Sequence, residues 1–290
     1  MNEHDMADEG AGERHDPASR LGGDFRTRLL SGLAMGAIAA LFVFTGAIPF
    51  TVLVVAIAVL LSWEWGRLVH GRDVDVVMVI HIGAACAAAV LAAFGYAGLG
   101  LLVLPIGAIL VMLLSLGSNS VYSAFGVFYT GLPAVAMIWL RSDAVMGLLA
   151  VVFLIVVSIT ADTGAFVAGR LLGGPRLWPQ VSPNKTWAGL VGALVACAVV
   201  GALFWFAVPE SSAVRLAGTA AFLSFVAQLG DLAESALKRR FGAKDASALI
   251  PGHGGVMDRV DGLIAVAAAA GLIGLALDVH YPARALLLGP

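Results

Sequence analysis

Long apolar segments, separated by short polar connections, follow one another through most of the 290 residues. A helix needs about 20 residues to cross the hydrocarbon core of a bilayer, and these segments are close to that length. The predicted spans are residues 29–46, 48–66, 77–95, 98–116, 121–140, 145–169, 187–208, 214–233 and 262–280. The pattern therefore predicts an all-α, polytopic integral membrane bundle of about nine transmembrane helices, within a range of about eight to ten.

The composition agrees with a membrane protein and excludes an ordinary soluble domain. Hydrophobic residues make up 60% of the chain and charged residues only 12%, with a mean hydropathy of +0.95. Soluble domains carry about 25% charged residues, because their surfaces face water. We expect much of the surface of this protein to face lipid instead.

Polar segments divide the chain into three parts. Residues 1–24 are polar and acidic, with almost nothing to bury, and are predicted to form a disordered tail. Residues 25–143 hold about five spans with little chemistry and are predicted to form an N-terminal transmembrane bundle. Residues 144–290 form the predicted catalytic region, whose two long polar connections are residues 170–186 and 234–261.

Positive charge sets the predicted orientation. With nine spans and a cytosolic N-terminus, all but three of the 17 Lys and Arg residues fall on the cytosolic side; the exceptions are Arg141, Arg215 and Arg284. Because cytosolic connections of membrane proteins are enriched in Lys and Arg, this distribution favours a cytosolic N-terminus. It also places both long polar connections in the cytosol, where nucleotides and Mg²⁺ are available.

Acidic residues in two of the spans are candidates for an ion site. Asp162 lies well inside the sixth span, where a charge is costly and usually serves a function. Asp231 follows directly on the apolar run of the eighth span and is a second candidate functional acid. Glu234 and Lys238 are four residues apart, a spacing for which a solvated ion pair on one helical face is the simplest explanation. Two interpretations are open for Lys238 and Arg239: they mark the positively charged cytosolic side of the membrane, or they neutralise an anionic lipid headgroup.

The connection before the seventh span combines helix signals with a candidate anion site. In "SPNKTWAG", Ser182 is expected to cap the helix and Pro183 to occupy its first turn. The free N–H groups and the dipole of a helix N-terminus also favour phosphate, and Lys185 and Thr186 flank this one. The segment alone supports both interpretations equally.

The stretch "KDASALIPGHGGVMDRVDG", residues 244–262, concentrates polar groups before the last span; among them are Lys244, Asp245, His253 and Arg259. A helix that begins near Met257 directs Asp258 and Asp261 to one side, because they are three residues apart. Gly254 and Gly255 leave room for the backbone to approach a phosphate. Since Mg²⁺ is commonly held by one or two carboxylates with phosphate oxygens and water, the stretch indicates Mg²⁺-dependent chemistry on phosphates.

A longer segment, "SALKRRFGAKDASALIPGHGGVMDRVD" (residues 235–261), resembles the signature of the phosphatidate cytidylyltransferases, also called CDP-diacylglycerol synthases. "DTGAFVAGR" and "SPNKTWAG" are similar to two earlier segments of that family, in the same order, so the resemblance covers roughly the C-terminal half. The family commonly has "SPKKTWEG", from which this chain differs at Asn184 and Ala188, and no role is assigned to these two residues. Lys185 remains to supply the charge directed at phosphate.

The resemblance implies transfer of CMP from CTP to phosphatidate, which gives CDP-diacylglycerol and pyrophosphate and requires Mg²⁺. The metal-ligand candidates are Asp162, Asp231, Asp258 and Asp261. The candidate catalytic contacts are Lys185, Lys244, Asp245, His253 and Arg259, and the substrate-binding candidates are Ser182, Thr186, Lys238, Arg239, Gly254 and Gly255. The implied partners are CTP, phosphatidate and a second copy of the chain in a homodimer, with no nucleic acid. The implied location is the plasma membrane, with the active-site loops facing the cytosol.

Two other functions fit parts of the sequence. An acid within a span is also typical of a cation-coupled transporter, although here the acids gather at one cytosolic edge rather than along a midplane path. A CDP-alcohol phosphotransferase would share the beginning of "DRVDGLIAVAAAAGLIGLALD", but Val266 and Leu275 stand where that family has Arg and an acid. Incorporation of labelled CTP into lipid separates these classes.

Overall fold

The computed structural model describes residues 17–71, 74–115, 117, 119–250 and 254–289. Its elements are α1 (Pro17–Thr45), α2 (Ala47–His70), α3 (Val76–Ala93), α4 (Ala97–Leu114), α5 (Ser120–Arg141), α6 (Gly147–Leu172), β1 (Arg176–Trp178), β2 (Ser182–Thr186), α7 (Trp187–Leu203), the 3₁₀ helix η1 (Phe204–Phe206), α8 (Ala213–Arg240), α9 (Met257–Leu277) and α10 (Pro282–Leu288). Helices dominate, as the all-α prediction requires.

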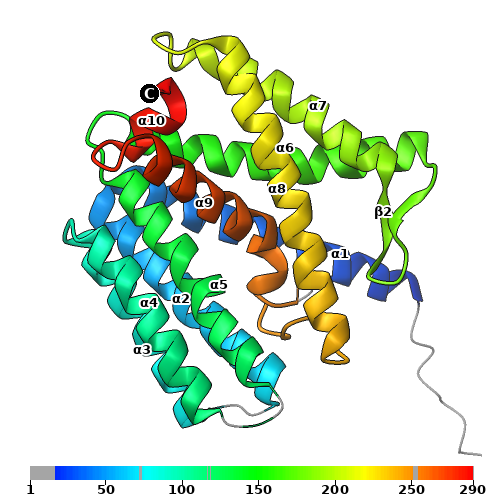
Figure 1. The fold of residues 1–290 in the computed structure, drawn as a ribbon. Coiled ribbons are helices and arrows are strands. Elements are labelled where there is room, and N and C mark those ends of the chain that lie inside the picture. Colours follow the sequence, from blue (N-terminus) through cyan, green and yellow to red (C-terminus); the bar gives the residue numbers. More distant parts are fainter. Residues whose placement is uncertain (1–16, 72–73, 116, 118, 251–253, 290) are drawn as a thin grey trace, which may run out of the picture.

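The helices fall into two groups that meet at α9 (Figure 1). Helices α2 to α5 pack side by side, and each of α3, α4 and α5 contacts its neighbours in the chain. Helices α6, α7 and α8 form the second group, in which α7 contacts both α6 and α8. Helix α9 packs against α5 on one side and α8 on the other. Its N-terminal turns therefore lie where the two groups meet.

Eight of the described helices, α2 to α9, are long and apolar enough to cross a membrane. The first predicted span, residues 29–46, corresponds to the apolar segment Ser31–Thr45 of α1, which is shorter. The polytopic helical membrane fold is thus confirmed, with a number of spans within the predicted range. Helix α1 already begins at Pro17, inside the predicted tail 1–24, and proline is well tolerated in a first helical turn. Residues 1–16 lie outside the described residues.

A short antiparallel hairpin, β1 and β2, precedes α7. Pairing with β1 keeps Ser182 and Pro183 extended within β2, so the helix begins only at Trp187. The residue that caps α7 is Thr186, whose hydroxyl oxygen accepts a hydrogen bond from the N–H of Gly189 at 3.0 Å. The expectation that Ser182 caps this helix and Pro183 occupies its first turn is therefore wrong.

Small residues bring α6 and α7 close together beside this hairpin. A Cβ atom at Gly192 of α7 would collide with the Cβ of Ala168 of α6. A Cβ at Gly164 of α6 would lie only 3.0 Å from the Cβ of Ala196. Close backbone approach through small residues is a usual way for membrane helices to associate. It places Asp162, on α6, near β2 and the start of α7.

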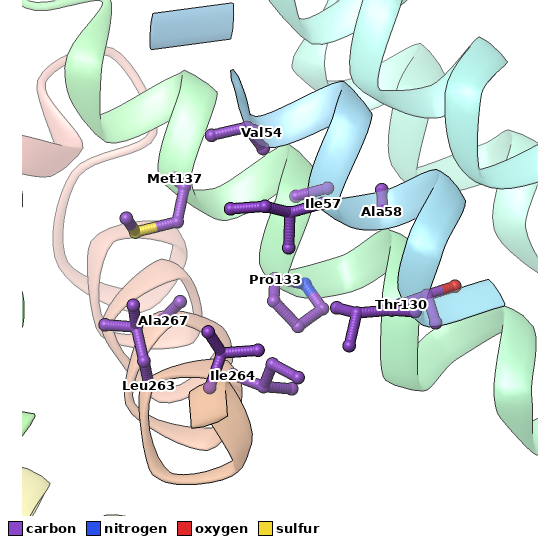
Figure 2. A pocket seen from close by; sticks show the side chains of 12 residues that line it. Val54, Ile57, Ala58, Thr130, Pro133, Met137, Leu263, Ile264 and Ala267 are labelled. Carbon is purple, nitrogen blue, oxygen red and sulfur yellow. The ribbon is translucent and has the colours of Figure 1, made fainter. Parts of the chain in front are cut away.

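Apolar side chains join α9 to the N-terminal group, as Figure 2 shows. They surround a small pocket of about 60 Å³ between α2, α5 and α9, whose lining includes Val54, Ile57, Pro133, Met137, Leu263 and Ile264. Burial of such surface is worth roughly 25 cal/mol per Å², which holds α9 against α2 and α5. The polar residues of α9 at the site, Asp258 and Asp261, belong to its first turns.

The C-terminal helix α10 packs against α9 and is tied to the α5–α6 connection by an ion pair. Nε of Arg284 donates to Oδ2 of Asp143 at 3.0 Å, and the Asp143 side chain is only 4% exposed. Oδ1 of Asp143 also accepts hydrogen bonds from the N–H groups of Val145 and Met146. Burial raises the pKa of Asp143, but the two N–H groups and Arg284 together lower it further, so its pKa lies below the ordinary value.

We expect the contact between α10 and the α5–α6 connection to become less stable in acid. Because the pKa of Asp143 is lower in the folded protein than in the unfolded chain, its ionised form stabilises the fold above about pH 4. This contribution is lost as the pH falls from there through the lower pKa of the folded state. The Tm of the wild type in detergent should therefore fall more steeply between roughly pH 5 and 3 than the Tm of Asp143→Asn. Glu210→Gln, at an exposed position, is the control. Parallel curves for wild type and Asp143→Asn would contradict this explanation.

Candidate active site

Helices α8 and α9 approach closely at the centre of the site. A Cβ atom at Gly230 of α8 would lie 2.5 Å from the Cβ of Ala265 of α9 and 3.1 Å from the carbonyl oxygen of Asp261. Any larger residue at position 230 would force the helices apart, because both atoms that it meets are close to the backbone of α9. Glycine at this position therefore sets how near the polar side chains of α8 and α9 come to one another.

Both helices extend further than the predicted spans. Helix α8 continues to Arg240, and α9 begins at Met257, the start considered for the helix that carries Asp258 and Asp261. Only residues 241–256 of the predicted connection 234–261 lie between the helices. Glu234 and Lys238 consequently belong to α8, where they face α9 instead of an open loop.

Three carboxylates converge where α8 and α9 approach: Asp231 and Glu234 of α8, and Asp261 of α9. One oxygen of each lies within 4.8 Å of the others. Glu234 is 2% exposed, and within the described part of the chain its Oε1 is buried without a hydrogen-bond partner. A buried carboxylate oxygen without a donor is costly, and a hard divalent cation takes oxygen ligands of this kind. We call these residues the acidic group; their geometry and donor atoms fit a metal ion.

Lys185 of β2 reaches the acidic group from the hairpin. Its Nζ lies 2.6 Å from Oδ2 of Asp231 and also donates to the side-chain and main-chain oxygens of Gln228, at 3.2 and 3.4 Å. The hydroxyl of Ser235 donates to the other oxygen of Asp231 at 3.3 Å. Lys185 therefore offsets part of the negative charge of the group while its ammonium remains at the edge of a pocket.

That pocket has a volume of about 320 Å³ and a mixed lining; we call it the polar pocket because charged and hydroxyl side chains line much of it. Its lining includes Asp162, Ser182, Asn184, Lys185, Thr186 and Asp231. The structure thus gathers most of the candidates from α6, β2 and α8 around one space, although Asp162 is not one of the three converging carboxylates. The volume is at the lower end of the range of small-ligand sites.

Lys238 is buried between two carboxylates. Its Nζ lies 2.6 Å from Oδ1 of Asp258 and 3.1 Å from Oε2 of Glu234. The three side chains are at most 11% exposed, so the expectation of a solvated pair between Glu234 and Lys238 is wrong. The pair is covered because α8 continues past its apolar span and packs against the first turn of α9.

Asp258 holds the connection between the two helices in place. Its Oδ2 accepts hydrogen bonds from the N–H groups of Gly255 at 2.8 Å and Ala246 at 3.0 Å. Gly254 has φ +81°, in the left-handed region, and a Cβ there would lie 3.0 Å from the same oxygen. Since Lys238 occupies Oδ1, Asp258 lies beside the acidic group rather than within it.

The remaining candidates surround this centre. Four of them are exposed, on the end of α8, in the connection and on the first turn of α9: Arg239, Lys244, Asp245 and Arg259. Nη1 of Arg239 donates to the carbonyl oxygen of Ala243 at 3.1 Å. His253 lies outside the described residues, so its place at the site stays a prediction.

A second pocket, largely apolar, adjoins the acidic group and has a volume of about 430 Å³. Aromatic side chains dominate its lining: Trp65, Tyr122, Phe125, Phe128 and Tyr129. Glu234 and Asp261 also line it. The acidic group therefore adjoins a polar pocket through Asp231 and an apolar pocket through Glu234 and Asp261.

Glu64 of α2 is a site residue that was not expected from the sequence. It is fully buried, and its carboxylate accepts hydrogen bonds from the hydroxyl of Ser247 and the N–H groups of Val256 and Met257. The available signal was an acid within an apolar span, as for Asp162. Its partners lie 183 to 193 positions away, which no local pattern reveals.

Helices long enough to span a membrane, a partly buried acidic group and two adjoining pockets of different polarity define a polytopic membrane protein with a candidate metal site. The sequence model of the cytidylyltransferase family matches residues 26–275. The chain belongs to the cytidylyltransferase family, and it is accordingly a nucleotidyltransferase.

Within this family, the chain is similar to proteins named phosphatidate cytidylyltransferase. The phosphatidate cytidylyltransferases of Brucella suis and Brucella melitensis are each 36% identical over 265 residues, which cover 87% of this chain and 93% of theirs. The phosphatidate cytidylyltransferase of Staphylococcus haemolyticus is 38% identical over 149 residues, or 51% of this chain and 56% of its own. The resemblance to this family expected from the sequence is confirmed.

Replacing Lys238 by Met should destabilise the protein strongly. The change leaves Asp258 and Glu234 buried without their shared cation, and the loss of one partner from a buried ion pair costs roughly 3 to 5 kcal/mol. Arg239→Met is the matched control, because its side chain is exposed on the same helix and surface charges contribute about 1 kcal/mol or less. Thermal unfolding in detergent measures both, and equal Tm values for the two variants would refute the assignment of Lys238.

Proposed function

We propose that the protein transfers CMP from CTP to phosphatidate and releases pyrophosphate. An oxygen of the lipid phosphate attacks the α-phosphorus of CTP, a new P–O bond forms, and the bond between the α- and β-phosphates breaks. The products are CDP-diacylglycerol and pyrophosphate, so the reaction serves phospholipid synthesis. The relatives named phosphatidate cytidylyltransferase support this choice of substrates.

The observation that carries the proposal is that the acidic group lies between two pockets, each lined by at least one of its residues. A nucleotide triphosphate and a lipid differ in polarity, and a transferase that joins them needs space for both. The polar pocket, with Lys185 and Thr186 in its lining, suits phosphate groups. The apolar pocket, lined by aromatic residues, suits the glycerol and acyl portion of a lipid. Asp231 lines the polar pocket, and Glu234 and Asp261 line the apolar pocket, so the acidic group lies where the reacting phosphates would meet.

Mg²⁺ is the proposed cofactor, held by Asp231, Glu234 and Asp261. When bound, Mg²⁺ neutralises phosphate charge and makes the phosphorus more electrophilic. Among the residues that the structure describes, none forms a hydrogen bond with the buried Oε1 of Glu234, which supports a cation in this position. The sequence proposed Asp258 and Asp162 as ligands as well; Asp258 is already bonded to Lys238, and Asp162 faces the polar pocket.

In this proposal basic residues of the chain neutralise the phosphate charge that Mg²⁺ does not. The nucleophile is already a phosphate anion, so the reaction needs positioning and charge neutralisation more than a general base. Lys185 is placed to bind phosphate oxygens in the polar pocket. Exposed Lys244, Arg239 and Arg259 would attract the triphosphate or the lipid headgroup, with Asp245 orienting Lys244 and His253 as a further contact.

The proposed setting is the cytosolic face of the plasma membrane. The connection 241–256 and the hairpin would then face the cytosol, as the distribution of Lys and Arg predicts. CTP would enter from the cytosol and phosphatidate from the bilayer. A homodimer without a nucleic-acid partner stays part of the proposal.

Family membership disfavours the two alternative functions considered from the sequence. A cation-coupled transporter or a CDP-alcohol phosphotransferase would not be expected to match the cytidylyltransferase family over residues 26–275. A transport assay that showed CTP-independent, cation-driven flux would reverse this choice.

Purified protein should convert labelled CTP and phosphatidate micelles into CDP-diacylglycerol only when Mg²⁺ is present. Thin-layer chromatography of the extracted lipid measures the product, and labelled pyrophosphate should appear in equal amount. Folded protein that forms no labelled lipid with Mg²⁺ and both substrates would refute the proposed function.

Asp261→Asn should separate catalysis from stability. The change keeps the volume of the side chain but removes one ligand charge, so turnover should fall by roughly 100-fold. It also relieves repulsion with Asp231 and Glu234, so the Tm should stay the same or rise. Asp258→Asn should lower turnover too, but with a lower Tm, because Asp258 pairs with Lys238. Asp278→Asn, at the other end of α9, is the matched control, and wild-type turnover in Asp261→Asn would show that this carboxylate is not a ligand.

A further inference from the structure

Glu64 brings a buried carboxylate from the N-terminal group of helices to the catalytic half of the chain. Its side chain is 0% exposed. The hydroxyl of Ser247 and the N–H of Val256 donate to its Oε1 at 2.6 and 2.8 Å, and the N–H of Met257 donates to its Oε2 at 2.6 Å. A buried carboxylate is costly unless it accepts such bonds, and hydrogen bonds to an ionised group are the strong ones. These contacts therefore fix Glu64 and its donors relative to one another.

The donors belong to the segment that carries the candidate chemistry. Val256 caps α9 and Met257 is its first residue, so Glu64 accepts from N–H groups that have no acceptor within the helix. A carboxylate at a helix N-terminus is also favoured by the helix dipole. Ser247 lies in the connection 241–256, close to Lys244 and Asp245 in the chain. One side chain of α2 thus holds both the start of α9 and the connection before it.

Asp258 holds the same segment from within α9. It accepts from the N–H groups of Ala246 and Gly255, the residues that neighbour the donors to Glu64. Gly255 lies between the two carboxylates: a Cβ there would be 2.5 Å from Oε1 of Glu64 and 3.1 Å from Oδ2 of Asp258. Gly255 has no left-handed backbone angle, so the space between Glu64 and Asp258 is what demands a glycine.

Helix α2 is itself firmly held next to Glu64. Trp65 is 1% exposed, its Nε1 donates to the carbonyl oxygen of Tyr122 at 3.0 Å, and its ring packs on Tyr129 with centroids 4.7 Å apart. The small apolar pocket of Figure 2 joins the preceding turns of α2, at Val54 and Ile57, to α5 and α9. The carboxylate of Glu64 therefore projects from a rigid part of the bundle.

We propose that Glu64 is a positioning residue: it sets the first turn of α9 and the described part of the connection, residues 241–250 and 254–256, and through them the places of Asp258, Asp261 and Lys244. Glu64 acts through these residues and does not touch substrate. The part of the inference that concerns turnover rests on the proposed function; the part that concerns local order does not.

Hydrogen exchange tests the local part without any substrate. In Glu64→Gln, one carboxylate oxygen becomes an NH₂ group that faces N–H donors, so the segment should open more easily. The amides of Ala246, Gly255, Val256 and Met257 should exchange at least about tenfold faster than in the wild type. Ser62→Ala is the matched control, because Ser62 is also 0% exposed on α2 but bonds to Thr130 instead of the connection. Unchanged exchange of these amides in Glu64→Gln would overturn the inference.

Mg²⁺ dependence distinguishes positioning from a general loss of folded protein. Partial unfolding of Glu64→Gln would lower the maximal rate but leave the half-saturating Mg²⁺ concentration unchanged. Misplaced acids should lower turnover by about tenfold or more and also raise that concentration severalfold. Ser62→Ala should match the wild type in both. Failure of the wild type to form product would count against the proposed function alone, whereas an active wild type with unchanged Mg²⁺ dependence in Glu64→Gln would overturn the positioning role.

A double substitution tests whether Gly255 serves Glu64. Gly255→Ala should strongly reduce turnover in the wild-type background, because its Cβ meets Oε1 of Glu64. In Glu64→Ala that oxygen is absent, so adding Gly255→Ala should reduce turnover by a much smaller factor. Factors that simply multiply would mean that Gly255 is required for a reason independent of Glu64, and would contradict this part of the inference.

Discussion

Repulsion among three close carboxylates, of which Glu234 is buried and Asp231 and Asp261 are partly buried, is the constraint on which the site depends. Asp231, Glu234 and Asp261 each bring an oxygen within 4.8 Å of the others. At this distance two like charges repel by about 3 kcal/mol when the effective dielectric constant is near 20. Lys185 and Lys238 offset part of this repulsion, and close packing of α8 on α9 at Gly230 holds the acids together against the rest. An added cation would offset the remaining repulsion.

The N-terminal helices contribute to the site more than their apolar sequence indicates. They supply Trp65 and the aromatic wall of the apolar pocket, as well as Glu64, whose carboxylate holds the start of α9. The second group of helices supplies the acidic group, Lys185 and the polar pocket. The site therefore forms only where the two groups meet at α9, as the arrangement in Figure 1 illustrates.

Features that depend on local spacing were predictable from the sequence. The lengths of apolar segments predict the membrane helices, and the helix considered from near Met257, which would direct Asp258 and Asp261 to one side, does begin at Met257. Features that depend on distant contacts were not. In the sequence Ser182 and Pro183 resemble a helix start, but in the structure their segment pairs with β1. Glu234 likewise resembles a surface acid in the sequence, but α9 covers it in the structure.

Glu64 shows the same limit at longer range. Its partners lie 183 to 193 positions further along the chain, and its contacts with them follow from the packing of α9 beside α2 and α5. The family resemblance did not point to Glu64 either, because the motifs that carry it lie in the C-terminal half of the chain. The match to the family model is longer and extends over residues 26–275. Tertiary packing, rather than any motif, makes this acid part of the site.

The position of a bound metal ion tests the central claim most directly. Crystals of the protein grown with Mn²⁺, which binds oxygen ligands as Mg²⁺ does, would show the ion by its anomalous scattering. The structure predicts a peak among the carboxylates of Asp231, Glu234 and Asp261, and no such peak in Asp261→Asn. A peak at full occupancy elsewhere, with these three carboxylates free of metal, would contradict the account.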